Sequence, residues 1–414
     1  MIEDLKEHIE KSFRRLSSED YSAEHIRKGN DYDWPADWEG RALLAFVSLY
    51  EITGEKTACL EAMPEALPKH LNAAGYMGAP LKENEADEQS LSGHSWMLRG
   101  LTEYYKAFGD AQVLQYAKSI VENLYLPRVK LYGSYPAGQR SVGGGVSGSR
   151  GAFLNGWHLS TDIGCAYMCI DGLSAYFEVT KTAEVKRAVD VLTEGFVSID
   201  YMRLNCQTHA TLSAARGLLR MYRCTGEQKY FLHAKRIFAY YVQNGMTLTY
   251  ENFNWFGRND TWTEPCAVAD SFILSLWLYE MTQDQRYQTF ASRIWFNGLR
   301  FCHCANGGAG PNTCVTESQP YLQVSMYEAP FCCTMRYCEA LKFAAQYRDA
   351  IVSSGDFLQD EHGRIFLGNK LLAEDAGGNF PRREEYVYRN KRLIEIPAFV
   401  ENSSAKLKIV HETR

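Results

Sequence analysis

The chain has 414 residues, of which 23% are charged and 46% hydrophobic, and 44 Lys and Arg oppose 50 Asp and Glu for a net charge of −6. This composition is ordinary for a folded globular protein and excludes an intrinsically disordered chain. Because the balance is slightly acidic and no long basic run occurs, we expect no nucleic-acid partner. Aromatic residues and cysteines are numerous, with 8 Trp, 26 Tyr, 20 Phe and 12 Cys. An excess of Tyr and Trp suggests either stacking on sugars or an aromatic core.

The first sixteen residues, MIEDLKEHIEKSFRRL, predict an amphipathic helix. They do not read as a signal peptide, because no uninterrupted apolar segment follows the charges. No stretch of about 18 apolar residues predicts a membrane span. We therefore expect a cytoplasmic protein without a membrane partner, in which the cysteines are mostly reduced. Reduced cysteines in this number point to buried thiols or to a metal site.

One pattern recurs along the chain, in which an apolar helix ends in an aromatic residue, a turn follows, and a second amphipathic helix begins. Its copies cover residues 43–56, 98–121, 171–192, 215–238 and 273–295, and residues 338–354 resemble the first half of another. The turns centre on Gly54, Gly109, Lys181, Gly226 and Gln283. Apolar residues at i, i+3 and i+4 within each copy indicate helices. Five or six such hairpins predict a mainly α fold, an (α/α)6 barrel, over residues 1–354.

Long aromatic and polar segments connect the hairpins, and we expect them to line one mouth of the barrel. They cover residues 28–40, 76–93, 131–160, 246–265 and 302–331. After residue 355 the pattern changes to a two-residue alternation with β-branched side chains, which predicts strands. Residues 355–414 are therefore predicted to form a small or incomplete β-domain.

The most specific set of chemistry-bearing residues joins two predicted helix starts. Glu264 and Cys266 open one helix, and the adjacent Cys332 and Cys333 open another. Three thiolates and a carboxylate satisfy a four-coordinate zinc site, and soft sulfur ligands favour zinc over magnesium or calcium. At the start of a helix, the pKa of a thiol is lowered, which favours the metal-bound thiolate.

Two alternatives to this zinc site stay open at the level of the residues. The cysteines are equally interpretable as reduced core residues, because the 66-residue gap between Cys266 and Cys332 matches no zinc-finger spacing. A rival metal site is the single loop that holds Cys302, His303, Cys304 and Cys314.

The two helix starts resemble glycoside hydrolase family 127, the zinc-dependent β-L-arabinofuranosidases and their relatives. Residues 261–299 are similar to the family's Glu-x-Cys helix and the helix after it, and FCCTMRY at 331–337 matches its paired cysteines. The resemblance, which runs from about residue 28 to 348, implies a barrel fold and a glycoside or oligosaccharide substrate. It also implies that Glu264, Cys266, Cys332 and Cys333 hold zinc, with Cys332 as the nucleophile.

Further roles follow from the same resemblance. Glu251, in the sequence Glu251-Asn252-Phe253, corresponds to the family's general acid/base, although Tyr250 stands where the family has Gly. The segment GHSWMLRGLTEYY resembles a helix whose histidine faces the sugar, which points to His94. Residues 31–46 resemble the first barrel helix and its preceding loop, which places Trp34 and Glu39 near the pocket. We expect Trp34, Trp96 and Trp255 to be stacking platforms for the sugar.

The chain also departs from the family pattern. Two substrate-facing histidines are replaced, approximately by Asp162 and Asn205, and His209 lies a few residues on as a partial substitute. Arg336 stands where the family has Asn, and we expect only a small β-rich segment where the family has long C-terminal β-domains. These departures alter the sugar contacts and spare the metal ligands.

Three functions are compatible with these residues. The first is a retaining glycosidase that uses a zinc-bound Cys332 and Glu251. The second is a sugar epimerase or unsaturated-uronide hydrolase without zinc, for which Asp162, His158 and His209 are candidate acid/base groups. The third is a non-catalytic carbohydrate-binding or zinc-stabilised structural protein. The sequence sets neither the sugar nor the oligomeric state.

Overall fold

Helices make up most of the chain that the computed structural model describes. It describes residues 5–29, 34–137, 147–247, 249–258, 260–314, 321–322 and 328–351, and five short strands after residue 356. Internal contacts divide the chain into two units, Leu16–Tyr240 and Met1–Arg15 with Tyr241–Arg414. Within the described residues, none of the helices has the length and apolarity needed to cross a membrane.

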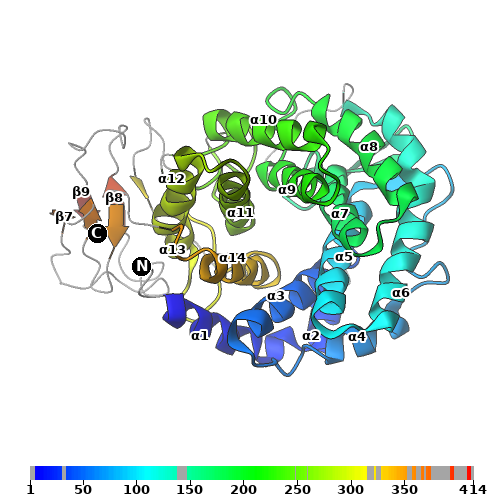
Figure 1. Cartoon of the computed structure of the whole chain (residues 1–414), viewed down its shortest axis with the longest axis horizontal. Coiled ribbons are helices and arrows are strands. Elements are labelled where there is room, and N and C mark those ends of the chain that lie inside the picture. Colours follow the sequence, from blue (N-terminus) through cyan, green and yellow to red (C-terminus); the bar gives the residue numbers. More distant parts are fainter. Residues whose placement is uncertain are drawn as a thin grey trace. The chain divides into compact units, whose positions relative to one another are not determined.

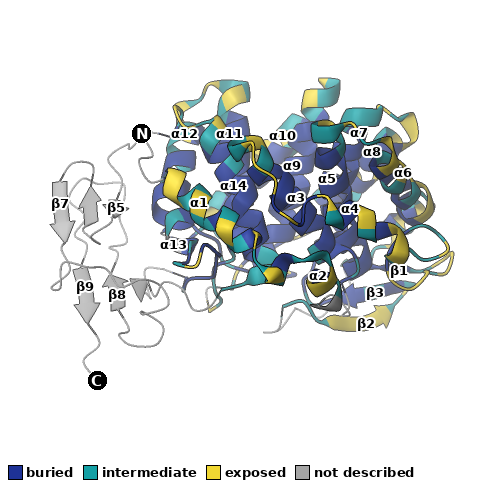
Figure 2. Cartoon of the chain, turned by 90° about the horizontal axis from the view of Figure 1, so that it is seen from below, coloured by how far each residue is buried: buried dark blue, intermediate teal, exposed yellow. Residues whose placement is uncertain are grey.

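Four long helices form the buried layer of the unit Leu16–Tyr240, and each packs against the next in chain order. They are α3 (Asp37–Thr53), α5 (Glu88–Phe108), α7 (Cys169–Thr180) and α9 (Thr208–Thr225). The more exposed helices α6 (Ala111–Ile120) and α8 (Ala183–Val197) return along α5 and α7 (Figures 1 and 2). Shorter helices complete the unit: η1 (Glu19–Tyr21), α2 (Ala23–Gly29), α4 (Ala62–Ala66), η2 (Leu67–His70), η3 (Val121–Tyr125), η4 (Leu126–Ser134) and η6 (Cys165–Met168). The division between the two units falls within helix α10 (Gln228–Asn244), after Tyr240.

The five predicted turns share one helix-ending geometry. Each turn residue has a positive φ in the left-handed region: Gly54, Gly109, Lys181, Gly226 and Gln283. Each donates its backbone N–H to the carbonyl of an aromatic residue four positions earlier: Tyr50, Tyr105, Phe177, Tyr222 and Tyr279. This is the left-handed C-cap that ends many helices. The aromatic residue before each turn is therefore a helix-end signal, and the predicted helix ends are confirmed.

Glycines let the buried helices approach one another closely. A Cβ at Gly40 of α3 would lie 2.2 Å from the backbone of Met97 in α5. A Cβ at Gly172 of α7 would lie 2.8 Å from the backbone of Ser95 in α5, and one at Gly217 of α9 would lie 2.7 Å from the backbone of Asp171 in α7. Any larger side chain would force these helices apart, because backbone atoms cannot give way as a flexible side chain can.

A small sheet lies at the start of α5. Its strands are β1 (Ala86–Asp87), β2 (Arg150–Leu154) and β3 (Trp157–Ser160), in the order β1-β3-β2. Strand β3 pairs parallel with β1 and antiparallel with β2. The side chain of Asp87, at the end of β1, accepts the backbone N–H of Ser90 and caps α5. The predicted connection 131–160 thus carries helix and strand structure of its own.

The other unit contains one helical hairpin and the cysteine-bearing helix beside it. Helix α11 (Pro265–Thr282) is largely apolar and buried as far as Leu278, as expected of an inner helix. It contacts both α12 (Gln285–Arg293) and α14 (Met335–Gln346) (Figure 1). The remaining helices are α1 (Leu5–Leu16), η7 (Ile294–Leu299), α13 (Arg300–Cys302) and η8 (Pro330–Thr334). Helix α1 confirms the predicted N-terminal helix.

The strands described in this unit form two antiparallel three-stranded sheets. One has the order β5-β6-β7, from β5 (Phe357–Gln359), β6 (Ile365–Leu367) and β7 (Lys370–Ala373). The other has the order β4-β8-β9, from β4 (Tyr321–Leu322), β8 (Arg392–Glu395) and β9 (Lys408–His411). The alternating segments therefore do contain strands. The predicted domain boundary at 354/355 lies outside the described residues.

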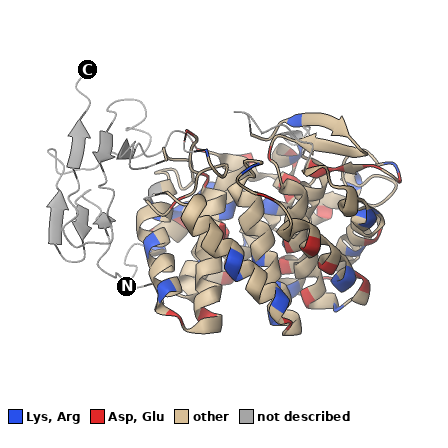
Figure 3. Cartoon of the chain, turned by 90° about the horizontal axis from the view of Figure 1, so that it is seen from above, with Lys and Arg blue, Asp and Glu red and all other residues tan. Residues whose placement is uncertain are grey.

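The charges on the helices are mixed in sign. Figure 3 shows Lys and Arg interspersed with Asp and Glu along the described helices. Lys186, for example, lies 3.0 Å from Asp190 and 2.8 Å from Glu227. Such exposed pairs contribute little stability individually.

We predict that Gly217→Ala lowers the free energy of unfolding by about 1–3 kcal/mol, because the added methyl group would overlap backbone atoms of α7. Urea denaturation checks this. Gly133→Ala is the matched control, since nothing lies within 4 Å of its Cβ position, and should not lower the unfolding midpoint. Equal midpoints for the two variants would contradict the close helix approach.

Candidate functional site

Three cysteines from two helices converge in the unit Met1–Arg15 with Tyr241–Arg414. Cys266 Sγ lies 3.0 Å from Cys332 Sγ and 3.7 Å from Cys333 Sγ. The three sulfurs lie within 4.8 Å of one another, and none of these cysteines is in a disulfide. Glu264 Oε1 lies 3.8 Å from Cys332 Sγ. The structure therefore brings together the four residues that the sequence predicted as metal ligands.

The local fold explains this convergence. Pro265 occupies the first turn of α11, where its missing N–H costs no hydrogen bond, and Glu264 is the N-cap residue. Cys332 and Cys333 lie in the π-helical turn η8, which continues into α14. Cys266 and the Cys332–Cys333 pair thus sit at helix N-termini, whose partial positive charge favours thiolates. The predicted lowering of the thiol pKa is nevertheless wrong for Cys266, because burial outweighs this effect.

The geometry of this donor set fits a soft divalent cation. In a tetrahedral zinc site, sulfurs bound at about 2.3 Å lie about 3.8 Å apart, which is close to the 3.7 Å between Cys266 and Cys333, whereas Cys266 and Cys332 are closer together, at 3.0 Å. Burial and the neighbouring Cys332 and Cys333 sulfurs raise the pKa of the Cys266 thiol. A bound cation would attract the thiolates and so lower the pKa of the thiols again. Cys266 and Cys333 are buried, whereas Cys332 and Glu264 are partly exposed.

Glu251 is fully buried and surrounded by hydrogen-bond donors. Its Oε1 accepts from Asn312 Nδ2 at 2.5 Å and from Thr263 Oγ1 at 3.2 Å, and its Oε2 accepts from Thr249 Oγ1 at 2.9 Å. The Cys302 thiol is 3.5 Å from Oε1. These contacts brace the start of α11, because Thr263 immediately precedes the candidate ligand Glu264.

The neighbouring Asn252 adds a second brace. Its Oδ1 accepts the backbone N–H of Glu264 at 2.7 Å, and so fixes the backbone of a candidate ligand. Asn252, Thr263 and Asn312 were not predicted from the sequence, because no spacing rule links Asn312 to a carboxylate 61 positions earlier.

The rival cysteine set does not converge. Among the described residues, Cys302, His303, Cys304 and Cys314 do not form a group of three or more ligand atoms within 4.8 Å. The Cys302 thiol faces Glu251, and Cys314 Sγ lies 3.6 Å from the Asn252 carbonyl. His303 instead contacts His8 and Ser12 of α1.

His94, in the unit Leu16–Tyr240, is buried with both ring nitrogens occupied. Nδ1 donates to the Ser90 carbonyl at 2.7 Å, and Nε2 accepts the Met77 backbone N–H at 3.0 Å. Burial lowers the pKa of His94 to about 4, so the imidazole is neutral near pH 7. These contacts tie α5 to the 71–77 turn, a structural role.

The side chains of Trp34 and Asp162 both hydrogen-bond to the short segment 147–148. Trp34 Nε1 donates to the Gly148 carbonyl at 2.9 Å. Asp162 is buried and accepts from the Ser147 hydroxyl and from the Gly148 backbone N–H, each at 2.9 Å. The structure thus gives both residues a part in holding residues 147–148.

Trp96 and His209 stack on each other with ring centroids 5.6 Å apart, and the Arg41 guanidinium lies 4.2 Å from the Trp96 ring centre. Trp96 is 1% exposed, so its surroundings are those of a core side chain. Glu39 is also buried. Asn205 is partly exposed, with a positive φ of 46° in the loop before α9.

Trp255, in the other unit, is buried and packs edge-on against Trp262 at 5.3 Å between ring centroids. Its packing is again that of a core side chain.

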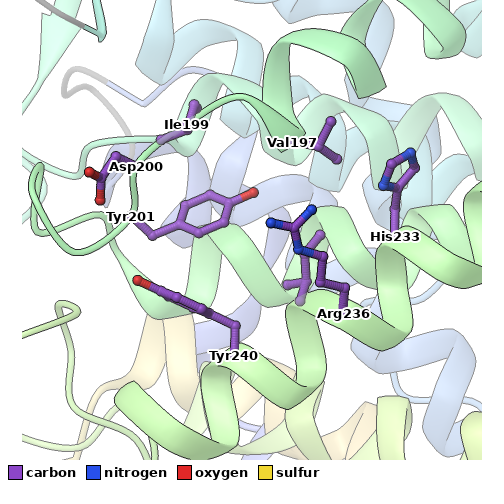
Figure 4. Close-up of a pocket in the computed structure, with 8 residues that line it drawn as sticks. Val197, Ile199, Asp200, Tyr201, His233, Arg236 and Tyr240 are labelled. Atoms are coloured by element: carbon purple, nitrogen blue, oxygen red, sulfur yellow. The ribbon is translucent and has the colours of Figure 1, made fainter.

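A pocket in the unit Leu16–Tyr240 lies between the end of α8 and helix α10 (Figure 4). Its lining includes Asp200, Tyr201, His233, Arg236 and Tyr240. None of the predicted site residues lines it, so it is separate from the residues proposed for chemistry.

The chain matches no family model and no curated protein. Solved structures similar to it include a GH127 β-arabinofuranosidase, with a TM-score of 0.53 and 12% identity over 98% of this chain and 63% of that one. An unsaturated glucuronyl hydrolase specific for heparin has a TM-score of 0.55 and 16% identity, and a D-mannose isomerase has 0.56 and 13%. Each of the latter two matches 84% of this chain and 98% of its own.

The fold is an (α/α)6 barrel. The predicted fold class is therefore confirmed. At these low identities the likeness shows the fold alone, and this barrel carries both glycoside hydrolases and sugar isomerases among the matched structures. Function must be argued from the site, because one fold hosts many activities.

The His94 contacts predict a pH dependence of stability. Its pKa is about 4 when folded and about 6.5 when unfolded, so the unfolded chain takes up this proton first as the pH falls. The contribution of neutral His94 to the free energy of unfolding is therefore complete above pH 6.5 and is lost toward pH 4. It amounts to a total on the order of 3 kcal/mol. His94→Gln should therefore lose less stability than the wild type between pH 7 and 4.5 in urea titrations. Identical losses would contradict this.

Proposed function

We propose that the protein is a zinc-dependent retaining glycoside hydrolase, similar in action to a β-L-arabinofuranosidase, with Cys332 as its nucleophile. The observation that carries the proposal is the convergence of Cys266, Cys332 and Cys333 beside Glu264. Within this cluster Cys332 is the partly exposed cysteine, as a group that attacks a substrate must be. The likeness to a GH127 β-arabinofuranosidase supports the substrate class.

Zinc, when bound, would keep the thiols ionised and fix their direction. The Cys332 thiolate would attack the anomeric carbon, so that a C–S bond forms while the bond to the leaving oxygen breaks. Glu251 would give its proton to that oxygen. Glu251 would then take a proton from water as the water oxygen attacks the same carbon and the thiolate leaves. Two displacements on one carbon retain its configuration.

The proposal gives Glu251 two tasks. Its four donors hold the start of α11 in place, and to act as an acid it must exchange one donor for the substrate oxygen. Hydrogen-bond donors to a carboxylate favour its ionised form, so the acid task requires that these contacts rearrange when substrate binds, as catalytic hydrogen bonds commonly do.

A second candidate is a zinc-independent sugar epimerase, isomerase or uronide hydrolase. It is favoured by the glucuronyl hydrolase and the D-mannose isomerase, whose whole length this chain nearly covers. Asp162, His158 and His209 would then carry the proton transfers. Metal content discriminates the two candidates.

We predict that protein purified without chelator contains one zinc per chain, and that Cys332→Ser lowers turnover of aryl glycosides, including β-L-arabinofuranosides, by at least about 10³-fold. Cys224→Ser is the matched control, because Cys224 is also a partly exposed thiol but lies outside the cluster. Metal content by mass spectrometry and initial rates are the measurements. Full turnover by Cys332→Ser on every accepted glycoside, or clearly less than one zinc per chain, would contradict the assignment.

Glu251→Gln separates the two tasks of Glu251. We predict that it slows substrates with poor leaving groups by at least about 10²-fold and slows activated nitrophenyl glycosides far less, because these need no proton at the leaving oxygen. Thr263→Val, which removes one brace, is the control for the structural task and should show no dependence on the leaving group. If both variants slow all substrates equally, Glu251 is only a brace.

A further inference from the structure

A buried ion pair lies directly beyond the thiol cluster. Arg336 Nη2 donates to Asp270 Oδ1 at 2.6 Å, and Arg336 Nη1 donates to Glu339. The side chains of Arg336 and Asp270 are 0% exposed, and that of Glu339 is 2% exposed. No catalytic step proposed above uses these residues.

The ion pair repeats the register of the thiols. Asp270 follows Cys266 by four residues along α11, and Arg336 follows Cys332 by four residues along η8 and α14. Four residues make about one helical turn. The same two helices therefore touch twice, first through sulfur and one turn later through guanidinium and carboxylate. Equal offsets on both helices mean that they run parallel with a fixed register.

The chemistry of this pair makes the register rigid. An ion pair buried to this extent adds little net stability, because desolvation offsets the attraction. It is nevertheless strict in geometry, since the planar guanidinium fork must meet Asp270 and Glu339 at the same time. Sliding or rotation of α14 along α11 would leave a buried charge unpaired, which is costly. The Cys332–Cys333 pair is thereby held at one distance from Cys266.

We propose that Arg336 is a positioning residue of the metal centre, which acts through Asp270 to set the spacing between Cys266 and the Cys332–Cys333 pair. The inference rests on the proposed zinc site and adds a residue to it. It also gives a physical reason for arginine at a position where the family pattern has Asn. Residues that orient metal ligands typically change metal affinity by about 10–100-fold when replaced.

The test compares Arg336→Met with a matched control, Arg220→Met. Arg220 Nη1 lies 2.5 Å from Asp171 Oδ1, and both side chains are at most 5% exposed. This second buried ion pair, whose Asp171 also binds Arg99 and Arg216, joins α9 to α7, which carry none of the four ligands. Both variants remove a buried cation, so both should lower the thermal midpoint of the metal-free protein.

Zinc affinity is measured by chelator competition, and ligand geometry by the thiolate-to-cobalt absorption of the cobalt-substituted protein. We expect Arg336→Met to weaken zinc binding by about 10–100-fold and to shift the cobalt spectrum, and Arg220→Met to leave both at wild-type values. Arg336→Lys, which keeps the cation but not the fork, should fall between. If Arg336→Met does not fold, the zinc affinity and cobalt spectrum of Arg336→Lys test the inference instead.

Three results overturn the inference. If wild-type protein binds zinc and the Arg336 variants bind it equally well, the ion pair is only structural and the zinc proposal stands. If the Arg220 and Arg336 variants weaken binding equally, the effect is general destabilisation. If wild-type protein binds no zinc, the proposed function and this inference both fail.

Discussion

The site depends on three sulfur atoms that lie within 4.8 Å of one another, with Cys266 Sγ 3.0 Å from Cys332 Sγ and 3.7 Å from Cys333 Sγ, and two of the three cysteines are buried. Three thiolates in such a volume would repel one another, and burial would add to that cost, so a bound cation would stabilise the ionised form of this cluster. The fold supplies what a cation needs. Two helix N-termini meet there, a proline starts one of them, and the carboxylate of Glu264 is the fourth candidate donor.

The surroundings of the thiols are organised to keep these helix starts in place. Asn252 fixes the backbone of Glu264, and Glu251 connects Thr263 to Asn312. One turn further along, Arg336 and Asp270 lock the two helices in register. Metal sites gain affinity when such outer contacts orient the ligands before binding. These buried polar residues therefore share one task in the proposed metal centre, which is to hold its ligands in place.

Much of the fold was predictable from local patterns. The apolar periodicity and the aromatic residue before each turn located the ends of five helices, because a helix end is a local event governed by backbone geometry. Lys181 and Gln283 take the left-handed conformation that glycine takes at the other three turns. The sheet of β1, β2 and β3 was not predicted, since its strands are short and β1 pairs with a strand about 70 residues further along the chain.

The site was predictable only where its residues form a recognisable sequence motif. Adjacent cysteines and a Glu-x-Cys helix start identified the thiol cluster, but its partners Asn312, Thr263 and Asp270 are ordinary residues whose roles depend on tertiary contacts. His94 and Trp96 show the opposite case. The family resemblance implied that His94 faces the sugar, and Trp96 was expected to be a stacking platform, whereas His94 is buried with both ring nitrogens hydrogen-bonded and Trp96 is buried.

Zinc-edge X-ray absorption of protein purified without chelator is the most direct test of the proposed metal centre. We expect one zinc per chain with three sulfur neighbours at about 2.3 Å and one oxygen at about 2.0–2.2 Å, and one sulfur fewer in Cys333→Ser. Zinc surrounded only by nitrogen and oxygen, or no zinc together with a Cys266–Cys332 disulfide, would contradict it.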